Sequence, residues 1–153
     1  MVACAVSLGS NVGDRRAHLN FAVASLRGLF TNLAVSRYYE TVPVGVSGPQ
    51  AMFLNAAVVG QTSLTARAVL EALLAIERER GRERPYARAP RTLDLDLILL
   101  GDVVLDEPDL VVPHPRFRER RFVLEPLAEI APDLKDPATG SPVAALLSRL
   151  GAP

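Results

Sequence analysis

The sequence predicts an α+β fold in which helices lie on one side of a largely antiparallel sheet. The chain has 153 residues, 49% of them hydrophobic, which suffices for the core of a single domain over residues 1–153. Apolar strand-like runs and segments with apolar residues every three or four positions alternate, separated by glycine and proline clusters. Their order is strand, helix, strand, strand, helix, strand. This is the order of the ferredoxin-like β-α-β-β-α-β motif, here with a C-terminal helical elaboration.

The first strand and helix come from the N-terminal thirty residues. Residues 2–8 form a short apolar run with β-branched residues that ends in a glycine-rich turn. Asp14 closes this turn and can cap a helix over residues 15–30, whose apolar side chains recur at helical spacing. His18 on that helix is expected at the surface.

The next two predicted strands cover residues 33–41 and 52–61, with a loop rich in proline and glycine between them. The second of these strands is apolar but contains Asn55, which offers both a donor and an acceptor. Asn55 could cap a neighbouring strand end or bind a ligand, and the sequence favours neither.

A second helix is expected from Ser63 to Gly81, because its apolar residues form a wide stripe and a glycine follows them. A basic loop with two prolines then covers residues 82–90. The remaining expected elements, in chain order, are a strand at 92–100, a turn at Gly101-Asp102, a strand at 103–105, a basic helical turn at 116–121, an apolar helix at 122–130 broken by Pro126, and a helix at 142–150.

The strand at 92–100 carries the most informative residues, Asp94 and Asp96. Alternation places Leu93, Leu95, Leu97 and Leu99 on one face and Thr92, Asp94, Asp96 and Ile98 on the other. Two carboxylates within a core-quality strand need partners, and hard cations such as Mg²⁺ would supply them. The alternative is the solvated face of a half-exposed sheet. The neighbouring arginines favour a metal–polyphosphate site instead.

Charge and composition limit the kinds of partner that the protein is expected to bind. The formal net charge is zero, which argues against non-specific binding to nucleic acid or a membrane. Six arginines lie within residues 78–91 and four within 116–121, a local clustering that suits a compact anionic ligand. The single cysteine, Cys4, excludes a disulfide framework and is expected to be a buried, inert thiol. Because no segment resembles a signal peptide or a membrane span, we expect a cytoplasmic protein. We also expect the protein to be a monomer.

Several short motifs, in this order and spacing, resemble those of the 6-hydroxymethyl-7,8-dihydropterin pyrophosphokinase family. The resemblance extends to about residue 135. The motifs are Ser7-Leu8-Gly9-Ser10-Asn11, Glu40-Thr41-x-Pro43, Phe53-Leu54-Asn55-Ala56-Ala57-Val58, Glu77 with Gly81-Arg82, Pro90-Arg91-Thr92-Leu93-Asp94-Leu95-Asp96, Val112-Pro113-His114-Pro115-Arg116, and Arg120 with Phe122-Val123-Leu124.

The resemblance implies that the chain transfers diphosphate from ATP to the hydroxymethyl group of 6-hydroxymethyl-7,8-dihydropterin, releasing AMP, in folate biosynthesis. It implies two Mg²⁺ ions held by Asp94 and Asp96, and charge neutralisation by Arg82 and Arg91. The implied ATP-binding residues are Leu74, Glu77, Arg82, Arg84, Arg88, Arg91, Ile98, His114 and Arg120. The implied pterin-binding residues are Thr41, Val42, Val44, Phe53, Asn55 and Phe122, with the two phenylalanines stacking on the ring and Asn55 reading its edge.

The sequence departs from the family pattern in the segment that precedes Asp94 and Asp96. The family usually carries Arg-Trp-Gly-Pro-Arg there, whereas this chain has Arg88-Ala89-Pro90-Arg91 and no Trp. Two rival classes are another two-metal nucleotidyl enzyme, such as a cyclase, and a regulatory or RNA-binding module of the same fold. The first needs no pterin pocket, and the acids and zero net charge disfavour the second.

Overall fold

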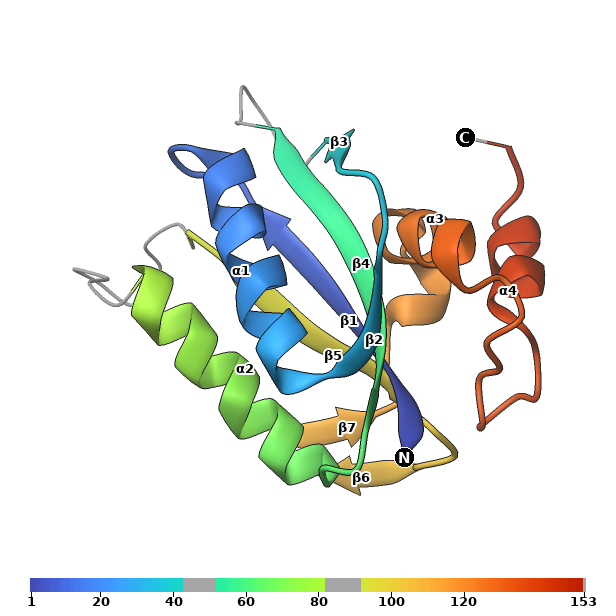
Figure 1. The fold of residues 1–153 in the computed structure, drawn as a ribbon. Coiled ribbons are helices and arrows are strands. Elements are labelled where there is room, and N and C mark those ends of the chain that lie inside the picture. The colour runs from blue at the N-terminus through green and yellow to red at the C-terminus, as the bar shows by residue number, and fades with distance from the viewer. Residues whose placement is uncertain (43–51, 82–91, 153) are drawn as a thin grey trace.

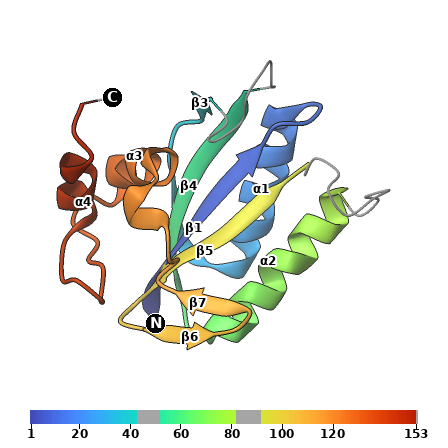
Figure 2. The same ribbon diagram turned by 180° about the vertical axis from the view of Figure 1, so that it is seen from behind.

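A computed structural model describes residues 1–42, 52–81 and 92–152, and Figures 1 and 2 show its fold from two sides. The sheet has the strand order β2-β4-β1-β5, with β3 also pairing with β4, and every pair is antiparallel. In chain order, the strands of this sheet and the two helices between them are β1 (Val2–Ser10), α1 (Arg15–Leu29), β2 (Thr31–Val35), β3 (Tyr39–Thr41), β4 (Phe53–Thr62), α2 (Ala66–Gly81) and β5 (Asp94–Leu100). The predicted α+β, ferredoxin-like fold is confirmed.

The C-terminal part adds a small hairpin and two helices. Its elements are β6 (Leu105–Glu107), β7 (Leu110–Val112), the 3-10 turn η1 (Phe117–Glu119), α3 (Arg121–Ile130) and α4 (Val143–Arg149). None of the helices in the described part of the chain has the length and apolarity needed to cross a membrane. The predicted strand at 103–105 begins two residues later and pairs with β7, a partner that the sequence analysis did not foresee.

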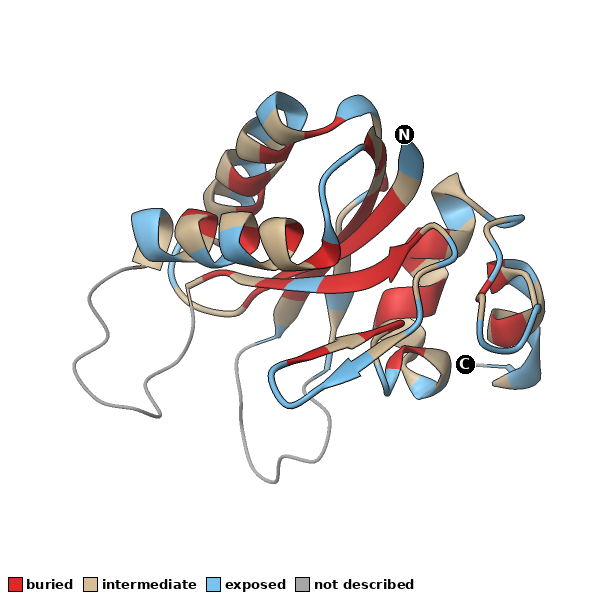
Figure 3. Ribbon diagram, turned by 90° about the horizontal axis from the view of Figure 1, so that it is seen from below, coloured by how far each residue is buried: buried red, intermediate tan, exposed pale blue. Residues whose placement is uncertain are grey.

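Two hydrophobic clusters lie on opposite faces of the sheet. The first joins Leu8 of β1 and Val58 of β4 to α1 and α2, and the second joins Ala5 and Ala57 to α3 and α4. Figure 3 shows buried residues concentrated where helices meet the sheet. The expectation that the helices lie on one side therefore holds only for α1 and α2, because α3 packs on the other face.

The N-terminal predictions agree with the structure. Asp14 is the N-cap of α1, and its Oδ1 accepts a hydrogen bond from Ala17 N at 3.1 Å. Cys4 is fully buried, and burial raises the pKa of its thiol to about 12, as expected of an inert cysteine. Helix α2 begins later than predicted, at Ala66. Thr65 rather than Ser63 caps it, since Thr65 Oγ1 accepts from Ala68 N at 3.1 Å.

Strand β5 breaks its alternation near its centre. Opposite β1, Leu97 pairs with Val6 and Leu99 with Ala5, so Ile98 is an extra residue at a β-bulge. The bulge turns Leu99 to the same side as Ile98, toward α3, and returns Leu100 to the side of α1 and α2. The predicted placement of Leu99 with Leu97 is therefore wrong, whereas Asp94 and Asp96 keep their predicted common face.

Helix α3 continues through Pro126, so the predicted break is wrong. Pro126 lacks a backbone N–H and removes one hydrogen bond from the helix, which usually kinks or ends it. Here Pro126 is buried, and its neighbours Val123, Leu124 and Leu127 are buried in the second cluster. The packing of this apolar face against the sheet compensates for the lost bond.

The segment after α3 is tied to η1 by a buried ion pair. The carboxylate of Asp136 is fully buried and accepts from Arg118 Nη2 at 3.0 Å, from Thr139 Oγ1 at 2.8 Å and from Ala138 N at 3.0 Å. Burial by itself raises the pKa of Asp136, but the hydrogen bonds from Arg118, Thr139 and Ala138 outweigh it and lower the pKa.

We expect Asp136→Ala to lower the free energy of unfolding by about 2–4 kcal/mol, because it leaves the partly buried guanidinium of Arg118 without its carboxylate. Chemical denaturation measures the loss. Glu119→Gln is the control, since Glu119 and Arg116 are both exposed and lie 3.8 Å apart, and its expected cost is below about 1 kcal/mol. Equal stability of the two variants would contradict the assignment.

Candidate functional site

One row of paired residues crosses the sheet where the candidate residues lie. Asp94 of β5 pairs with Gly9 of β1, Gly9 pairs with Asn55 of β4, and Asn55 pairs with Tyr39 of β3. Residues paired across a sheet present their side chains to the same face. Ala5 and Ala57, an even number of residues away, pack against α3, so this row belongs to the α3 face.

Asn55 is held in a defined orientation. Its side chain is buried, with 4% exposed, and its Oδ1 accepts a hydrogen bond from Thr41 Oγ1. A Cβ at Gly9 would lie 3.0 Å from Asn55 Nδ2 and 3.9 Å from Phe53 Cδ1. Because Gly9 has no side chain, the amide of Asn55 can pack closely over its backbone, with the ring of Phe53 nearby. This role of Gly9 was not predicted from the sequence.

Asp94 and Asp96 lie beside this position on the same face of β5. Asp96 pairs with Ser7 and is exposed, and Asp94 pairs with Gly9 and is half-buried. No set of three or more His, Cys, Asp or Glu side chains with metal-binding geometry exists among the described residues. Two carboxylates fit a Mg²⁺ site, because Mg²⁺ is usually held by one or two carboxylates together with substrate phosphates and water.

His114 follows β7 and lies at the edge of β5. Its backbone N donates to Ile98 O at 2.9 Å, and its Nδ1 accepts from Arg116 N at 3.1 Å. Burial, Arg120 and Arg116 lower the pKa of His114 and outweigh the opposite effect of Asp96. The neutral ring therefore carries its proton on Nε2, which can donate to an anionic ligand.

Arg120 and Phe122 lie at the junction of η1 and α3. The guanidinium carbon of Arg120 lies 5.5 Å from the centroid of the Phe122 ring, a cation–π distance. Phe122 also packs against the second cluster, which includes Ala57, two residues from Asn55 on the same face. The C-terminal elaboration thus brings both residues to the α3 face of the sheet.

Three of the ATP-site candidates lie along the edge formed by β5. Glu77 of α2 accepts from Leu95 N through its Oε2 at 2.7 Å, and Leu74, one turn earlier, is exposed. The Ile98 side chain is buried in the second cluster, so a contact with a nucleotide would have to use its backbone. Five candidates lie outside the described residues: Val44 from the pterin-binding set, and Arg82, Arg84, Arg88 and Arg91 from the ATP-binding set.

Arg15, which the sequence analysis did not single out, holds the ends of two site strands. Its Nη1 donates to Met52 O at 2.9 Å, and its Nη2 forms an ion pair with Glu40. Glu40 precedes Thr41 at the end of β3, and Met52 precedes the first residue of β4. The motif Glu40-Thr41 was the available signal, but only the fold supplies the partner of Glu40.

The sequence predicts that His18 is a surface residue, but in the structure it links α1 to α2. Its Nδ1 accepts from Arg80 Nε at 2.8 Å, and Arg80 also lies over the ring of Phe21 at 5.2 Å. Burial first, and then the charge of Arg80, lower the pKa of His18 below its ordinary value of 6.5. Protonation would give Nδ1 a hydrogen and abolish its role as an acceptor.

We expect the free energy of unfolding to fall as the pH drops through and below about 6.5. Both histidines have lowered pKa values in the folded chain, so the unfolded chain binds protons more readily in this range. Melting temperatures at pH 7.5 and 5.5 measure the effect. His18→Gln should show a smaller fall than the wild type, and an equal fall would contradict the pKa shift of His18.

Comparisons with known proteins agree with one another. The model of the family described as 7,8-dihydro-6-hydroxymethylpterin-pyrophosphokinase matches residues 5–132. The 2-amino-4-hydroxy-6-hydroxymethyldihydropteridine pyrophosphokinase of Bacillus subtilis is 46% identical over 138 residues, covering 89% of this chain and 82% of that protein. The enzyme with the same name from Synechocystis is 41% identical over 148 residues, covering 95% and 74%.

A solved structure described as Plasmodium falciparum HPPK-DHPS wild type shares the fold. It superimposes with a TM-score of 0.74 at 14% identity, and the match covers 97% of this chain. The chain spans 44% of the length of that protein. At this identity the likeness concerns the arrangement of strands and helices alone.

Proposed function

The chain belongs to the 7,8-dihydro-6-hydroxymethylpterin-pyrophosphokinase family, and from this premise we propose how its residues carry out the reaction. The reaction is transfer of diphosphate from ATP to the hydroxymethyl group of 6-hydroxymethyl-7,8-dihydropterin in folate synthesis. The hydroxymethyl oxygen forms a bond to the β-phosphorus as the bond from that phosphorus to the α,β-bridging oxygen breaks. AMP leaves with the bridging oxygen, and the hydroxyl proton is lost.

The pterin half of the site lies around Gly9. Asn55 would read the polar edge of the ring through its Nδ2, which lies over Gly9, because Thr41 fixes the orientation of the amide at Oδ1. Phe53, which lies near the same position at Gly9, would stack on one face of the ring and Phe122 on the other, each contact worth about 1 kcal/mol beyond burial. The main chain at Thr41, Val42 and Val44 would complete the edge contacts.

The metal-binding half lies on β5, next to this pocket. Asp94 and Asp96 would hold two Mg²⁺ ions, which when bound neutralise phosphate charge and orient the reacting oxygens. Support comes from the common face of the two carboxylates and from the row of Asp94, which also contains Gly9 and Asn55. The transferred group would then lie between the acids of β5 and the amide of β4.

The phosphates and the nucleoside would extend from the acids toward the edge of β5. His114 Nε2 and Arg120 would donate to phosphate oxygens, and Arg82, Arg84, Arg88 and Arg91 would neutralise the remaining charge. Leu74 and Glu77 on α2, with the backbone of Ile98, would contact the adenosine. Positioning and charge neutralisation suffice for such a transfer, without a covalent intermediate on the protein.

The observation that carries this proposal is the cross-sheet row that unites Asp94, Gly9 and Asn55 on one face. Incubation of the full chain with ATP, Mg²⁺ and the reduced pterin should release AMP, and omission of the pterin or of Mg²⁺ should abolish the release. A cyclic nucleotide product would indicate the rival cyclase class, and RNA binding without turnover would indicate the binding module. We also propose that residues 1–153 act as one catalytic domain, as a cytoplasmic monomer.

A further inference from the structure

The strand that carries Thr41 contains an irregularity just before the site. Val35 of β2 pairs with Val58 of β4, and Tyr39 of β3 pairs with Asn55. Val35 and Tyr39 are four positions apart, whereas their partners on β4, Val58 and Asn55, are three positions apart. One extra residue therefore lies between Val35 and Tyr39. This is a β-bulge, and it divides the strand predicted at 33–41 into β2 and β3.

Ser36 connects the N-terminal side of the bulge to β4. Its backbone N donates to Ala57 O at 2.9 Å, and its Oγ accepts from Ala57 N at 2.9 Å while donating to Arg37 O at 2.7 Å. The Ser36 hydroxyl thus replaces a backbone carbonyl in the ladder to β4. The bulge leaves the backbone N–H of Arg37 without a partner on β4.

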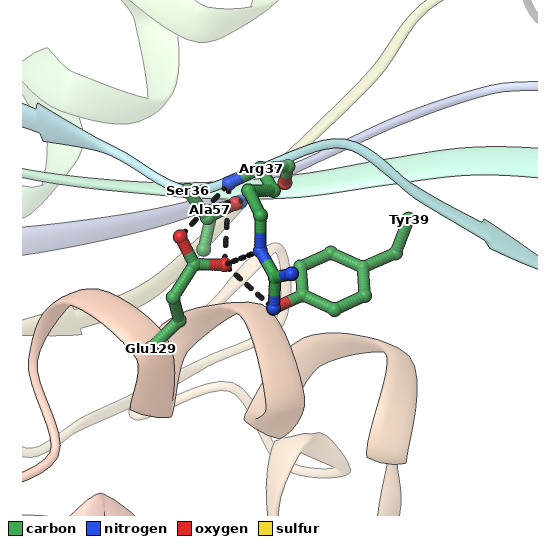
Figure 4. A network of polar contacts seen from close by, with 5 residues as sticks. All are labelled: Ser36, Arg37, Tyr39, Ala57 and Glu129. Atoms are coloured by element: carbon green, nitrogen blue, oxygen red, sulfur yellow. Dashed lines mark hydrogen bonds and ion pairs between the residues drawn. The ribbon is translucent and has the colours of Figure 1, made fainter.

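Glu129 of α3 supplies that partner, as Figure 4 shows. The backbone N of Arg37 donates to both carboxylate oxygens, at 3.2 and 3.1 Å, and Tyr39 OH donates to Oε1 at 2.5 Å. Arg37 Nε lies 3.4 Å from Oε1, and its guanidinium covers the Tyr39 ring. The carboxylate of Glu129, 92 positions from Arg37 and 90 from Tyr39, therefore binds both residues of the bulge region.

The bulge decides which side chains of β3 face the site. With the extra residue, Tyr39 is opposite Asn55, and Thr41 reaches the Asn55 amide. Without it, Tyr38 would be opposite Asn55, and a shift of one residue turns every following side chain to the other face. Tyr38 is held on the far face, where its OH donates to Asn20 Oδ1 of α1 at 2.7 Å.

We propose that Glu129 is a positioning residue for the pterin: by binding the bulge at Arg37 and Tyr39, it sets the register of β3 and so holds Thr41 against Asn55. This inference rests on the proposed function, since it assigns the Thr41–Asn55 pair to the pterin half of the site. Glu129 itself touches neither Thr41 nor Asn55 through any hydrogen bond in the described structure, so its effect passes through β3.

The test compares Glu129→Gln, Glu129→Ala and a matched control, Glu125→Gln, in the full chain. Glu125 lies on the same helix and pairs with Arg121 at 3.6 Å, away from the bulge. Loss of the charged acceptor should raise the KM for the pterin about tenfold and leave the KM for ATP within about twofold. Hydrogen exchange of the backbone amides at residues 37–41 should become faster in the Glu129 variants and stay normal in Glu125→Gln.

The outcomes separate this inference from the function on which it rests. No pterin-dependent AMP release by the wild type would overturn the proposed function. A normal wild type with an unchanged pterin KM in both Glu129 variants would overturn the positioning role alone. Equal rises in both KM values together with a lower melting temperature would assign Glu129 a purely structural role and would also overturn the inference.

Discussion

Asp94→Asn and Asp96→Asn should each lower kcat by at least about a thousandfold while leaving the melting temperature close to that of the wild type. Asparagine keeps the size of the side chain but removes the charge that would hold a divalent cation against the phosphates. Asp96 is exposed and Asp94 half-buried at the end of β5, so neither substitution disturbs the apolar packing of the strand. The structural core of β5 is formed instead by its leucines and Ile98.

AMP release and thermal unfolding should be measured on the same preparations. Asp102→Asn is the matched control, because Asp102 is an exposed acid in the turn that directly follows β5. It should retain wild-type turnover. Near-normal turnover in either Asp94→Asn or Asp96→Asn would exclude the metal-binding role, and a collapse of the melting temperature would show that these carboxylates stabilise the fold instead.

Asn55→Ala should weaken pterin binding by about a hundredfold or more and leave ATP binding unchanged, because a buried site built to match polar ring edges loses much affinity when a partner is removed. The amide is buried, oriented by Thr41 and packed closely over Gly9. Gly9→Ala should give the same selective loss from the other side, since its Cβ would lie 3.0 Å from Asn55 Nδ2.

Titration calorimetry with the pterin and with a non-hydrolysable ATP analogue measures both affinities. Asn20→Ala is the control, because Asn20 also accepts a hydrogen bond from a hydroxyl, that of Tyr38, but lies on α1 across the sheet. It should bind both ligands normally. Normal pterin affinity in Asn55→Ala and Gly9→Ala would place the pocket elsewhere. The same measurement on Phe122→Ala tests the stacking half of the pocket.

The C-terminal elaboration has a definite role in this arrangement. Helix α3 covers the second face of the sheet near Ala5 and Ala57, and Phe122 at its N-terminal end packs against the same cluster. Its C-terminal half carries Glu129 to the bulge in the β2–β3 segment. The Arg118–Asp136 ion pair ties η1 to the segment after α3. A helix that the core motif lacks therefore contacts the site strands at both ends.

Local patterns determined most of the fold and the choice of the candidate site residues. The apolar run of β1, the helical spacing after Asp14 and the alternation that puts Asp94 and Asp96 on one face all depend on residues close in sequence, where period and capping act directly. The family motifs likewise carry their chemistry in short segments. These features could be predicted because they do not depend on which distant segments become neighbours.

Tertiary structure alone decided the register and the partners. The two bulges, at Ile98 and after Ser36, change which side chains share a face, and each is stabilised by a distant group: His114 N for the first and Glu129 for the second. The same holds for the ion pair of Arg15 with Glu40 and for the close packing of the Asn55 amide over Gly9. A single extra residue in a strand costs little locally, so its position is fixed by the long-range contacts that satisfy its unpaired backbone groups, and those contacts exist only in the folded chain.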